Sequence, residues 1–221
     1  MQSYFQEELG KLRKRLNKMF ILVNSQLERS YQSVSSLEFE TNDTATQNES
    51  RIDKLDIKID KLCQRIFALA QPVATDLRFI MSSLRIGNEI ERIGDIALDI
   101  IGRSDMVRPY QEALEPYRVP TLFHEVMKLT GQCAEAYANN NNELAKEIVV
   151  ACKNAEESCK LVFHEIISQM TVKSDVIIIA TDLILIMGPG TDHQSPGEYC
   201  RIGRIHCRGQ THQTCIAPNK T

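Results

Sequence analysis

The sequence of 221 residues contains no tryptophan, and aromatic residues make up only 6% of it. β-Sandwiches draw heavily on β-branched and aromatic residues, so this shortage favours helices packed through Leu, Ile and Ala. An excess of one charge is also lacking, because 26 basic and 29 acidic residues leave a net charge of −3. Nucleic-acid binding therefore has little electrostatic support, and we expect no nucleic-acid partner.

Segments that direct a chain into or across a membrane are also lacking. The N-terminus, MQSYFQEELGKLRKR, is charged and has no apolar core of a signal peptide. The most apolar run, residues 176–187, is too short to cross a bilayer and contains Asp182. Seven cysteines, an odd number, indicate reduced thiols when no export signal is present. We expect a cytoplasmic protein that is peripheral to a membrane at most.

Apolar residues recur every three or four positions along most of the chain, which is the spacing of amphipathic helices. Such stripes cover residues 5–34, 52–69, 76–103, 122–137 and 144–166, and a further apolar helix opens at 175–186. Residues 37–48 are polar and are expected to join the first two helices. Four asparagines at 139–142 predict a turn, and prolines at 109, 116 and 120 predict a linker.

This pattern predicts an all-α protein made of two antiparallel three-helix bundles packed side by side. The first bundle would occupy residues 1–108, the linker residues 109–120 and the second bundle residues 121–187. Three helices, a linker and a second set of helices indicate an internal duplication, although sequence identity between the halves is low. The second bundle is incomplete in this prediction, because helical spacing stops near residue 187 and residues 188–221 read as an irregular tail.

The tail is rich in Gly, Pro, His and Cys, and two interpretations of it compete. One is a zinc site built from Cys200, Cys207, Cys215, His193, His206 and His212, whose spacing lacks the usual C-x2-C pairs. The other is translation out of frame. Read one nucleotide later, the codons permitted from Gly190 onward allow a helical sequence that begins Glu-Arg-Ile, the triplet found at 91–93. We favour the frameshift.

A polar stripe crosses the apolar helix expected at residues 76–103. Asn88, Glu91, Asp95 and Asp99 follow one another at steps of three and four, so they share one line along the helix. Like charges at this spacing destabilise an isolated helix, so water, facing cations or a metal ion must offset the repulsion. Glu91 and Asp95 lie one turn apart and can converge on one cation, with Asn88 and Asp99 as outer ligands or second-sphere acceptors.

Two carboxylates are too few for a metal site, and further candidates lie on the preceding helix. Asp53, Asp56 and Asp60, with Glu49 before them, are spaced by three and four beside its apolar stripe. Asp53 and Asp56 are candidate ligands facing Glu91 and Asp95, although the intervening lysines equally fit a solvated face. Oxygen ligands suit magnesium, manganese, iron and in some sites zinc.

The segment QPVATDLRFIMSSLRIGNEIERIGDIALDI, residues 71–100, resembles the first-repeat signature of the PhoU family, the phosphate-signalling accessory proteins of bacteria and archaea. The resemblance rests on the proline junction, the Asp-Leu-Arg after it and the E-x-x-x-D motif from Glu91 to Asp95, and weaker similarity covers residues 5–186. It implies two three-helix repeats that bind iron or zinc clusters through such motifs. The second motif belongs after residue 186, where this chain reads GPGTDHQ.

The resemblance also implies partners, namely the ATPase of the phosphate ABC transporter and a membrane sensor kinase, whose phosphate-starvation signalling such proteins damp. We therefore expect a non-enzymatic, homodimeric regulator that carries a divalent or trivalent metal. Two alternatives stay open. A di-iron metalloenzyme would need Glu-x-x-His pairs, which His124-Glu125 and His164-Glu165 do not provide, and a helical adaptor would need no metal.

Overall fold

The structure is a computed structural model that describes residues 2–36, 43–70, 72, 74–108, 112, 115–116 and 118–172. This part of the chain forms five α-helices and no strand: α1 (Gln2–Ser35), α2 (Thr44–Ala70), α3 (Ala74–Val107), α4 (Val119–Asn139) and α5 (Asn142–Val172). None of these five helices has a stretch apolar enough to cross a bilayer. The helix expected at 175–186, the tail and its candidate zinc ligands lie outside the described residues.

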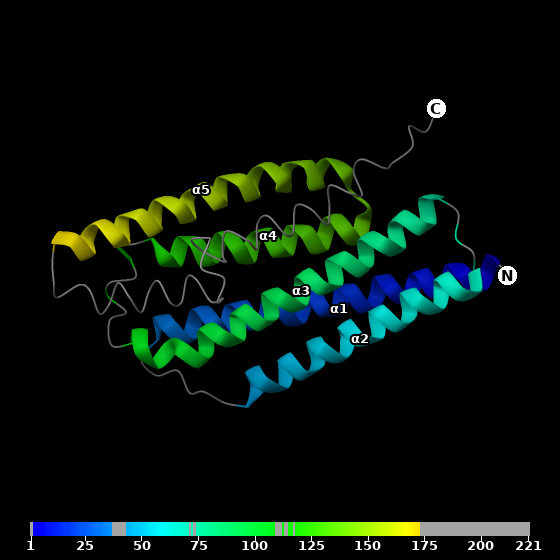
Figure 1. The fold of residues 1–221 in the computed structure, drawn as a ribbon, viewed down its shortest axis with the longest axis horizontal. Helices are drawn as coiled ribbons and strands as arrows, with labels where there is room; N and C mark the ends of the chain where they lie inside the picture. Colours follow the sequence, from blue (N-terminus) through cyan, green and yellow to red (C-terminus); the bar gives the residue numbers. More distant parts are fainter. Residues whose placement is uncertain are drawn as a thin grey trace.

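Helices α1, α2 and α3 lie side by side in an antiparallel bundle, and α4 and α5 form a hairpin that packs on α1 (Figure 1). The all-α prediction is confirmed. Helix α3 ends at Val107 and α4 begins at Val119, on either side of the predicted linker. The division into two repeats at residues 1–108 and 121–187 stays a prediction.

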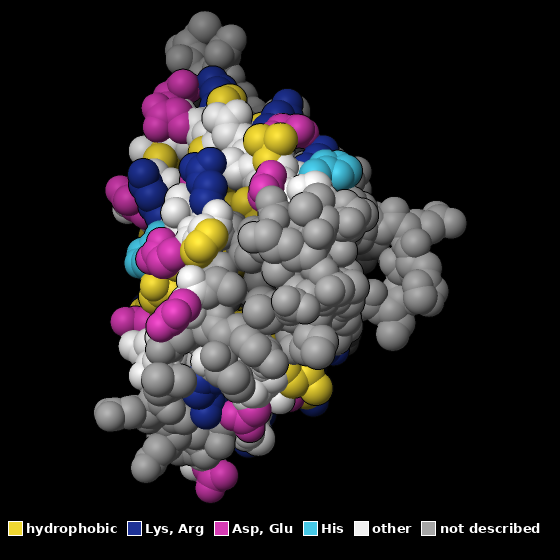
Figure 2. Space-filling view, turned by 90° about the vertical axis from the view of Figure 1, so that its left-hand side faces the viewer, with side chains coloured by type: hydrophobic (Ala, Val, Ile, Leu, Met, Phe, Trp, Pro, Cys, Tyr) yellow, Lys and Arg dark blue, Asp and Glu magenta, His cyan; other side chains and the backbone are white. Residues whose placement is uncertain are grey.

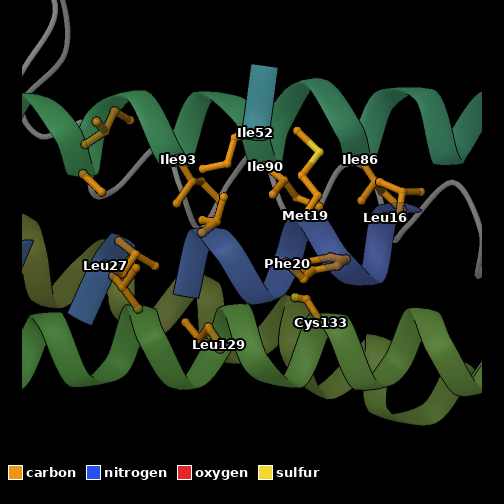
Figure 3. Packing of buried hydrophobic residues seen from close by; sticks show 14 of the residues in the cluster. Leu16, Met19, Phe20, Leu27, Ile52, Ile86, Ile90, Ile93, Leu129 and Cys133 are labelled. Atoms are coloured by element: carbon orange, nitrogen blue, oxygen red, sulfur yellow. The ribbon is translucent and has the colours of Figure 1, made fainter. Parts of the chain in front are cut away.

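Helix α1 supplies the centre of the apolar core. Its heptad-like stripe buries Leu16, Met19 and Leu27 completely, and Figure 3 shows these side chains beside isoleucines of α2 and α3. Phe20 lies on the opposite side of α1, towards Cys133 of α4 (Figure 3). One helix therefore contributes to the interior on both sides, which is why both the three-helix bundle and the hairpin depend on it.

The connection between α1 and α2 is shorter than predicted, because α2 begins at Thr44 rather than after residue 48. Its polar first turns are stabilised across the bundle by Gln26 of α1. The buried Gln26 amide donates to the Ala45 carbonyl at 3.2 Å and to Oε2 of Glu49 at 3.3 Å. Buried polar groups are tolerated when such partners exist, and these partners are distant in sequence.

The four asparagines form the predicted turn between α4 and α5. Asn140 adopts the left-handed conformation, with φ of 49°, and ends α4, a role that asparagine fills better than most residues other than glycine. Asn141 donates its N–H to the Ala136 carbonyl at 2.9 Å and accepts from the Leu144 N–H at 3.1 Å. One short turn thus closes α4 and caps α5.

Tyr137 of α4 joins the hairpin to the three-helix bundle. Its ring is fully buried, stacks on Phe79 of α3 at 5.9 Å and tilts against Phe20 of α1 at 6.4 Å. Ser83 donates to the Phe79 carbonyl at 2.8 Å, so the Tyr137 hydroxyl is left to donate to Ser83 Oγ at 3.0 Å. Burial raises the pKa of Tyr137 above its usual range, so the hydroxyl stays a donor.

Tyr137 substitutions separate the ring's contribution from that of the hydroxyl. Tyr137→Phe should lower the free energy of unfolding by about 1 kcal/mol, because one buried hydrogen bond is lost while Ser83 keeps its carbonyl partner. Tyr137→Ala should cost about 3–5 kcal/mol, because it leaves a cavity between three helices. Urea denaturation followed by circular dichroism measures both, with Tyr4→Phe, at an exposed residue, as the control. A Phe variant as unstable as the Ala variant would contradict this account.

Candidate metal centre between α2 and α3

Two glycines of α3 allow α2 to approach at the level of the predicted acidic residues. A Cβ at Gly87 would lie 3.5 Å from Oδ1 of Asp56, and a Cβ at Gly94 would lie 3.4 Å from Oε2 of Glu49. The antiparallel helices thus pair glycines seven residues apart with acids seven residues apart. These carboxylates lie at van der Waals distance from the α3 backbone, and the tightest contact that a Cβ at Gly94 would meet is Cδ1 of Ile52, at 3.1 Å.

Four of the five predicted metal ligands lie within electrostatic reach of one another, and their binding of a metal stays a prediction. Glu91 is half-buried, and the charges that act on it include Asp95, Asp56 and Asp53. Asp95 and Asp53 also act on Glu49. These five carboxylates therefore form one acidic cluster, which we define as Glu49, Asp53, Asp56, Glu91 and Asp95.

The outer members of the predicted stripe are not part of this cluster. Asn88 and Asp99 are exposed, and so is Asp95. Asp95 is counted in the cluster because its charge acts on both Glu49 and Glu91.

Glu49 is the member that the sequence prediction did not include among the ligands. Its side chain is buried, with 9% of the residue exposed. Oε2 accepts the hydrogen bond from Gln26, whereas Oε1 has no hydrogen-bond partner in the described part of the chain. A signal was available, since Glu49 precedes Asp53 by four residues and Asp56 by seven, which places it on the same helical line.

Burial and mutual repulsion raise the pKa values within the acidic cluster. Burial is the largest cause for Glu49, whose pKa rises to about 8, followed by the nearby Asp95 carboxylate and the charges of Asp53 and Glu91. Burial and then Asp95, Asp56 and Asp53 raise the pKa of Glu91 to about 7, against a small opposing effect of Arg92. The pKa of Asp56 is also raised, by burial first. Near neutral pH this cluster therefore retains protons unless a cation replaces them.

The donor set fits a hard or borderline cation, although the side chains as placed do not form a coordination sphere. Among the described residues, no three His, Cys, Asp or Glu side chains lie close enough together to hold a metal ion. Oδ1 of Asp56 and Oε1 of Glu49 are nevertheless buried without a hydrogen-bond partner in this part of the chain. Both oxygens belong to α2, and carboxylate oxygens are ligands that magnesium, manganese and iron accept.

The remaining candidate ligands lie apart from the acidic cluster. His124 is exposed on α4, with Nδ1 at 2.6 Å from the Pro120 carbonyl, and His164 is exposed on α5. The four cysteines of the described helices are buried: Cys63, Cys133, Cys152 and Cys159. Burial is the first cause that raises the pKa of Cys63 to about 12, so this thiol stays protonated and unreactive.

Comparison with known proteins gives consistent matches. Residues 16–103, which include most of α1 and all of α2, match the family model of the PhoU domain. The PhoU homolog of Aquifex aeolicus, a phosphate-specific transport system accessory protein, is 27% identical over 144 residues, 65% of each chain. PhoU of Serratia marcescens is 26% identical over 179 residues, 80% of this chain and 73% of its own length. The matched region thus spans about two thirds of these relatives.

A solved structure agrees with the fold. The crystal structure of PhoU from Pseudomonas aeruginosa superposes with a TM-score of 0.72 at 23% identity, covering 96% of this chain and 94% of that one. The family model covers the motif from Glu91 to Asp95 on α3, and the named relatives and the solved structure are likewise PhoU proteins. Residues 16–103 match the PhoU domain, and the chain is similar to PhoU proteins in sequence and in fold.

Proposed function

We propose that this chain is a metal-binding, non-enzymatic regulator of phosphate uptake and phosphate-starvation signalling, acting in the cytoplasm. Its partners would be the ATPase of the phosphate ABC transporter and the membrane sensor kinase. The names of its relatives support the link to phosphate transport, since they are called accessory proteins of the phosphate-specific transport system. The observation that supports the metal is the acidic cluster, in which the buried Glu49 and the half-buried Asp56 of α2 lie within electrostatic reach of Glu91 and Asp95 of α3.

In this proposal the metal replaces the protons of the acidic cluster. Glu91 and Asp95 of α3, with Asp53, Asp56 and Glu49 of α2, would hold it. The family resemblance favours iron or zinc, and the oxygen donors also accept manganese or magnesium. A bound cation supplies positive charge between two helices that otherwise repel. The Gln26 amide orients Glu49 from the side of α1, so three helices would be fixed together.

A rigid bundle of this kind suits regulation by protein contact, and we include a homodimer in the proposal. The outer face of the α4–α5 hairpin supports it. Two hollows of about 240 and 200 Å³ lie there, lined in part by Leu122 and Leu129 of α4 and Leu161 of α5. Leu161 and Val150 are exposed, and exposed apolar surface of this kind is typical of an interface.

The metalloenzyme alternative receives no support from the described residues. Di-iron bundles use Glu-x-x-His pairs that project inward, whereas His124 and His164 are exposed on the hairpin. The acidic cluster consists of carboxylates alone. We therefore retain regulation by contact as the proposed function.

The first test concerns metal content. Glu91→Ala with Asp95→Ala should abolish co-purifying metal, measured by elemental analysis of the purified protein, because both α3 ligands are removed. The matched control is Glu143→Ala with Glu147→Ala, a second pair of carboxylates one turn apart, exposed on α5. An unchanged metal content in the α3 variant would count against the site.

The second test uses the pH dependence of stability in the metal-free protein. An acid whose pKa is higher in the folded than in the unfolded state stabilises the fold below its unfolded pKa, and this stabilisation disappears as pH rises through the folded pKa. For Glu49 and Glu91 the unfolded value is 4.5 and the folded values are about 8 and about 7. The melting temperature should therefore fall between pH 5 and pH 8.

Glu49→Gln should remove most of this fall. The amide cannot ionise, so the variant should exceed the parent at pH 8 by on the order of 2 kcal/mol and match it near pH 5. The exposed Glu28→Gln on α1 is the control and should follow the parent at both pH values. Added metal should flatten the profile of the parent. A parent profile that rises with pH would refute the raised pKa values.

The third test addresses regulation itself. In a bacterial strain that lacks its own PhoU protein and carries a reporter on a phosphate-starvation promoter, this chain should restore repression when phosphate is abundant. The variant Glu91→Ala with Asp95→Ala should restore less repression at equal protein level, and the α5 control pair should restore as much as the parent. Full reporter activity with all three proteins would contradict the proposed function.

A further inference from the structure

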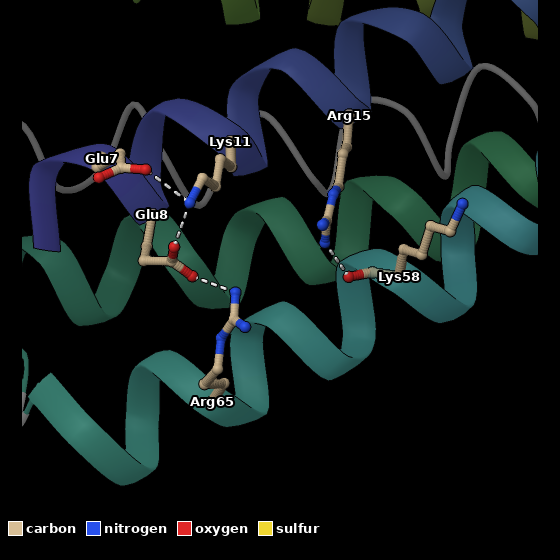
Figure 4. Close-up of polar contacts among 6 residues, drawn as sticks. All are labelled: Glu7, Glu8, Lys11, Arg15, Lys58 and Arg65. Carbon is tan, nitrogen blue, oxygen red and sulfur yellow. Dashed lines mark hydrogen bonds and ion pairs between the residues drawn. The ribbon is translucent and has the colours of Figure 1, made fainter. Parts of the chain in front are cut away.

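The seam between α1 and α2 presents a face whose charges differ from those of the acidic cluster. Arg15 of α1 donates to the Lys58 carbonyl of α2 at 2.5 Å, and Glu8 of α1 pairs with Arg65 of α2 (Figure 4). These contacts fix the antiparallel register of the two helices. Residues 8–18 of α1 therefore lie beside residues 54–65 of α2.

Five exposed lysines flank this seam, and we call them the lysine face: Lys14 and Lys18 on α1, and Lys54, Lys58 and Lys61 on α2. None of them forms an ion pair within the described ranges. The neighbouring arginines are used internally, since Arg15 and Arg65 bridge the helices and Arg13 lies 4.6 Å above the Phe79 ring. The charges free to meet a partner are thus ammonium groups, which are compact and strongly hydrated.

Few carboxylates offset the lysine face. Glu7 and Glu8 are paired with Lys11, at 2.7 and 2.9 Å, while Asp53 and Asp60 act on the carboxylates at the α3 side of α2. At the end of the molecule seen in Figure 2, by contrast, the described acidic and basic side chains are interspersed. A chain with a net charge of −3 therefore concentrates positive charge along one pair of helices.

An exposed isoleucine stands among the lysines on each helix. Ile57 of α2 is 51% exposed, at helical spacing from Lys54 and Lys61 on one side and from Asp53 and Asp60 on the other, and Ile21 of α1 is 69% exposed, one turn after Lys18. A solvated face of a single bundle gains nothing from large apolar side chains in these positions. Apolar side chains flanked by lysines are typical of helices that lie on a membrane surface, where lysine stems extend past the apolar group to reach phosphates.

We propose that the lysine face binds the surface of a bilayer that contains anionic phospholipids, with Ile21 and Ile57 seated among the headgroups. This goes beyond the proposed function and depends on different residues from the acidic cluster. Lysines suit such a surface, because its charge is diffuse and offers no fixed fork for arginine to match. Each lysine near an anionic surface raises the partition constant roughly fivefold, so five lysines give binding that is weak, reversible and screened by salt.

Vesicle co-sedimentation with the full chain tests the proposal. The chain should bind vesicles of phosphatidylglycerol mixed with phosphatidylcholine at low salt, should leave them at high salt, and should ignore phosphatidylcholine alone. The variant Lys54→Gln, Lys58→Gln, Lys61→Gln should lower the partition constant roughly a hundredfold. The control changes the same number of exposed lysines on α4 and α5, as Lys128→Gln, Lys146→Gln, Lys153→Gln, and should bind like the parent.

Further variants separate a bilayer from an acidic protein as the partner. Ile21→Ser with Ile57→Ser should weaken vesicle binding several-fold with unchanged helical circular dichroism, because these side chains contribute only if they enter the headgroup layer. Failure of the parent to bind anionic vesicles, equal loss in the two lysine variants, or capture by immobilised polyglutamate without vesicle binding would overturn the proposal. Glu91→Ala with Asp95→Ala should leave vesicle binding unchanged. The metal-site proposal and the membrane proposal can therefore fail independently of each other.

Discussion

Repulsion among carboxylates at the α2–α3 seam is the constraint on which the rest of this bundle depends. Apolar burial stabilises helix packing, yet here the same contact places the buried Glu49 and the half-buried Asp56 beside the α3 backbone. Ionised, these groups oppose the packing; protonated or bound to a cation, they permit it. The stability of the seam is therefore tied to what the acidic cluster holds, and apolar contacts alone do not decide it.

The heptad-like stripes predicted the helices correctly, because burial on one face leaves a period that a single sequence records. The start of α2 was not predictable in this way, since the polar residues at its first turns are stabilised by Gln26, which lies about twenty residues earlier. Tertiary contact, rather than local preference, decides where that helix begins. The helix expected at 175–186 lies outside the described residues and remains a prediction.

Helical spacing also predicted most of the candidate site, but not the members that depend on contacts between helices. Spacing placed Glu91 and Asp95 on one line, and Asp53 and Asp56 act on Glu91 across the seam between α2 and α3, while the binding of a metal by these residues stays a prediction. Glu49 was not predicted as a ligand, because its burial depends on contacts with Gly94 and Gln26, and these contacts cannot be deduced from the sequence. The lysine face was not predicted, because its lysines come from both α1 and α2. The register of two helices cannot be deduced from the apolar stripe of either one alone.

The buried pair of Tyr137 and Ser83 helps to set the axial position of the α4–α5 hairpin, which apolar packing alone does not specify. Leucine and isoleucine accept many neighbours, so a seam made of them tolerates a slide of one helical turn. A hydroxyl shut off from water tolerates only positions where a partner is within reach. The contact at 3.0 Å thus favours one axial position of the hairpin along the three-helix bundle.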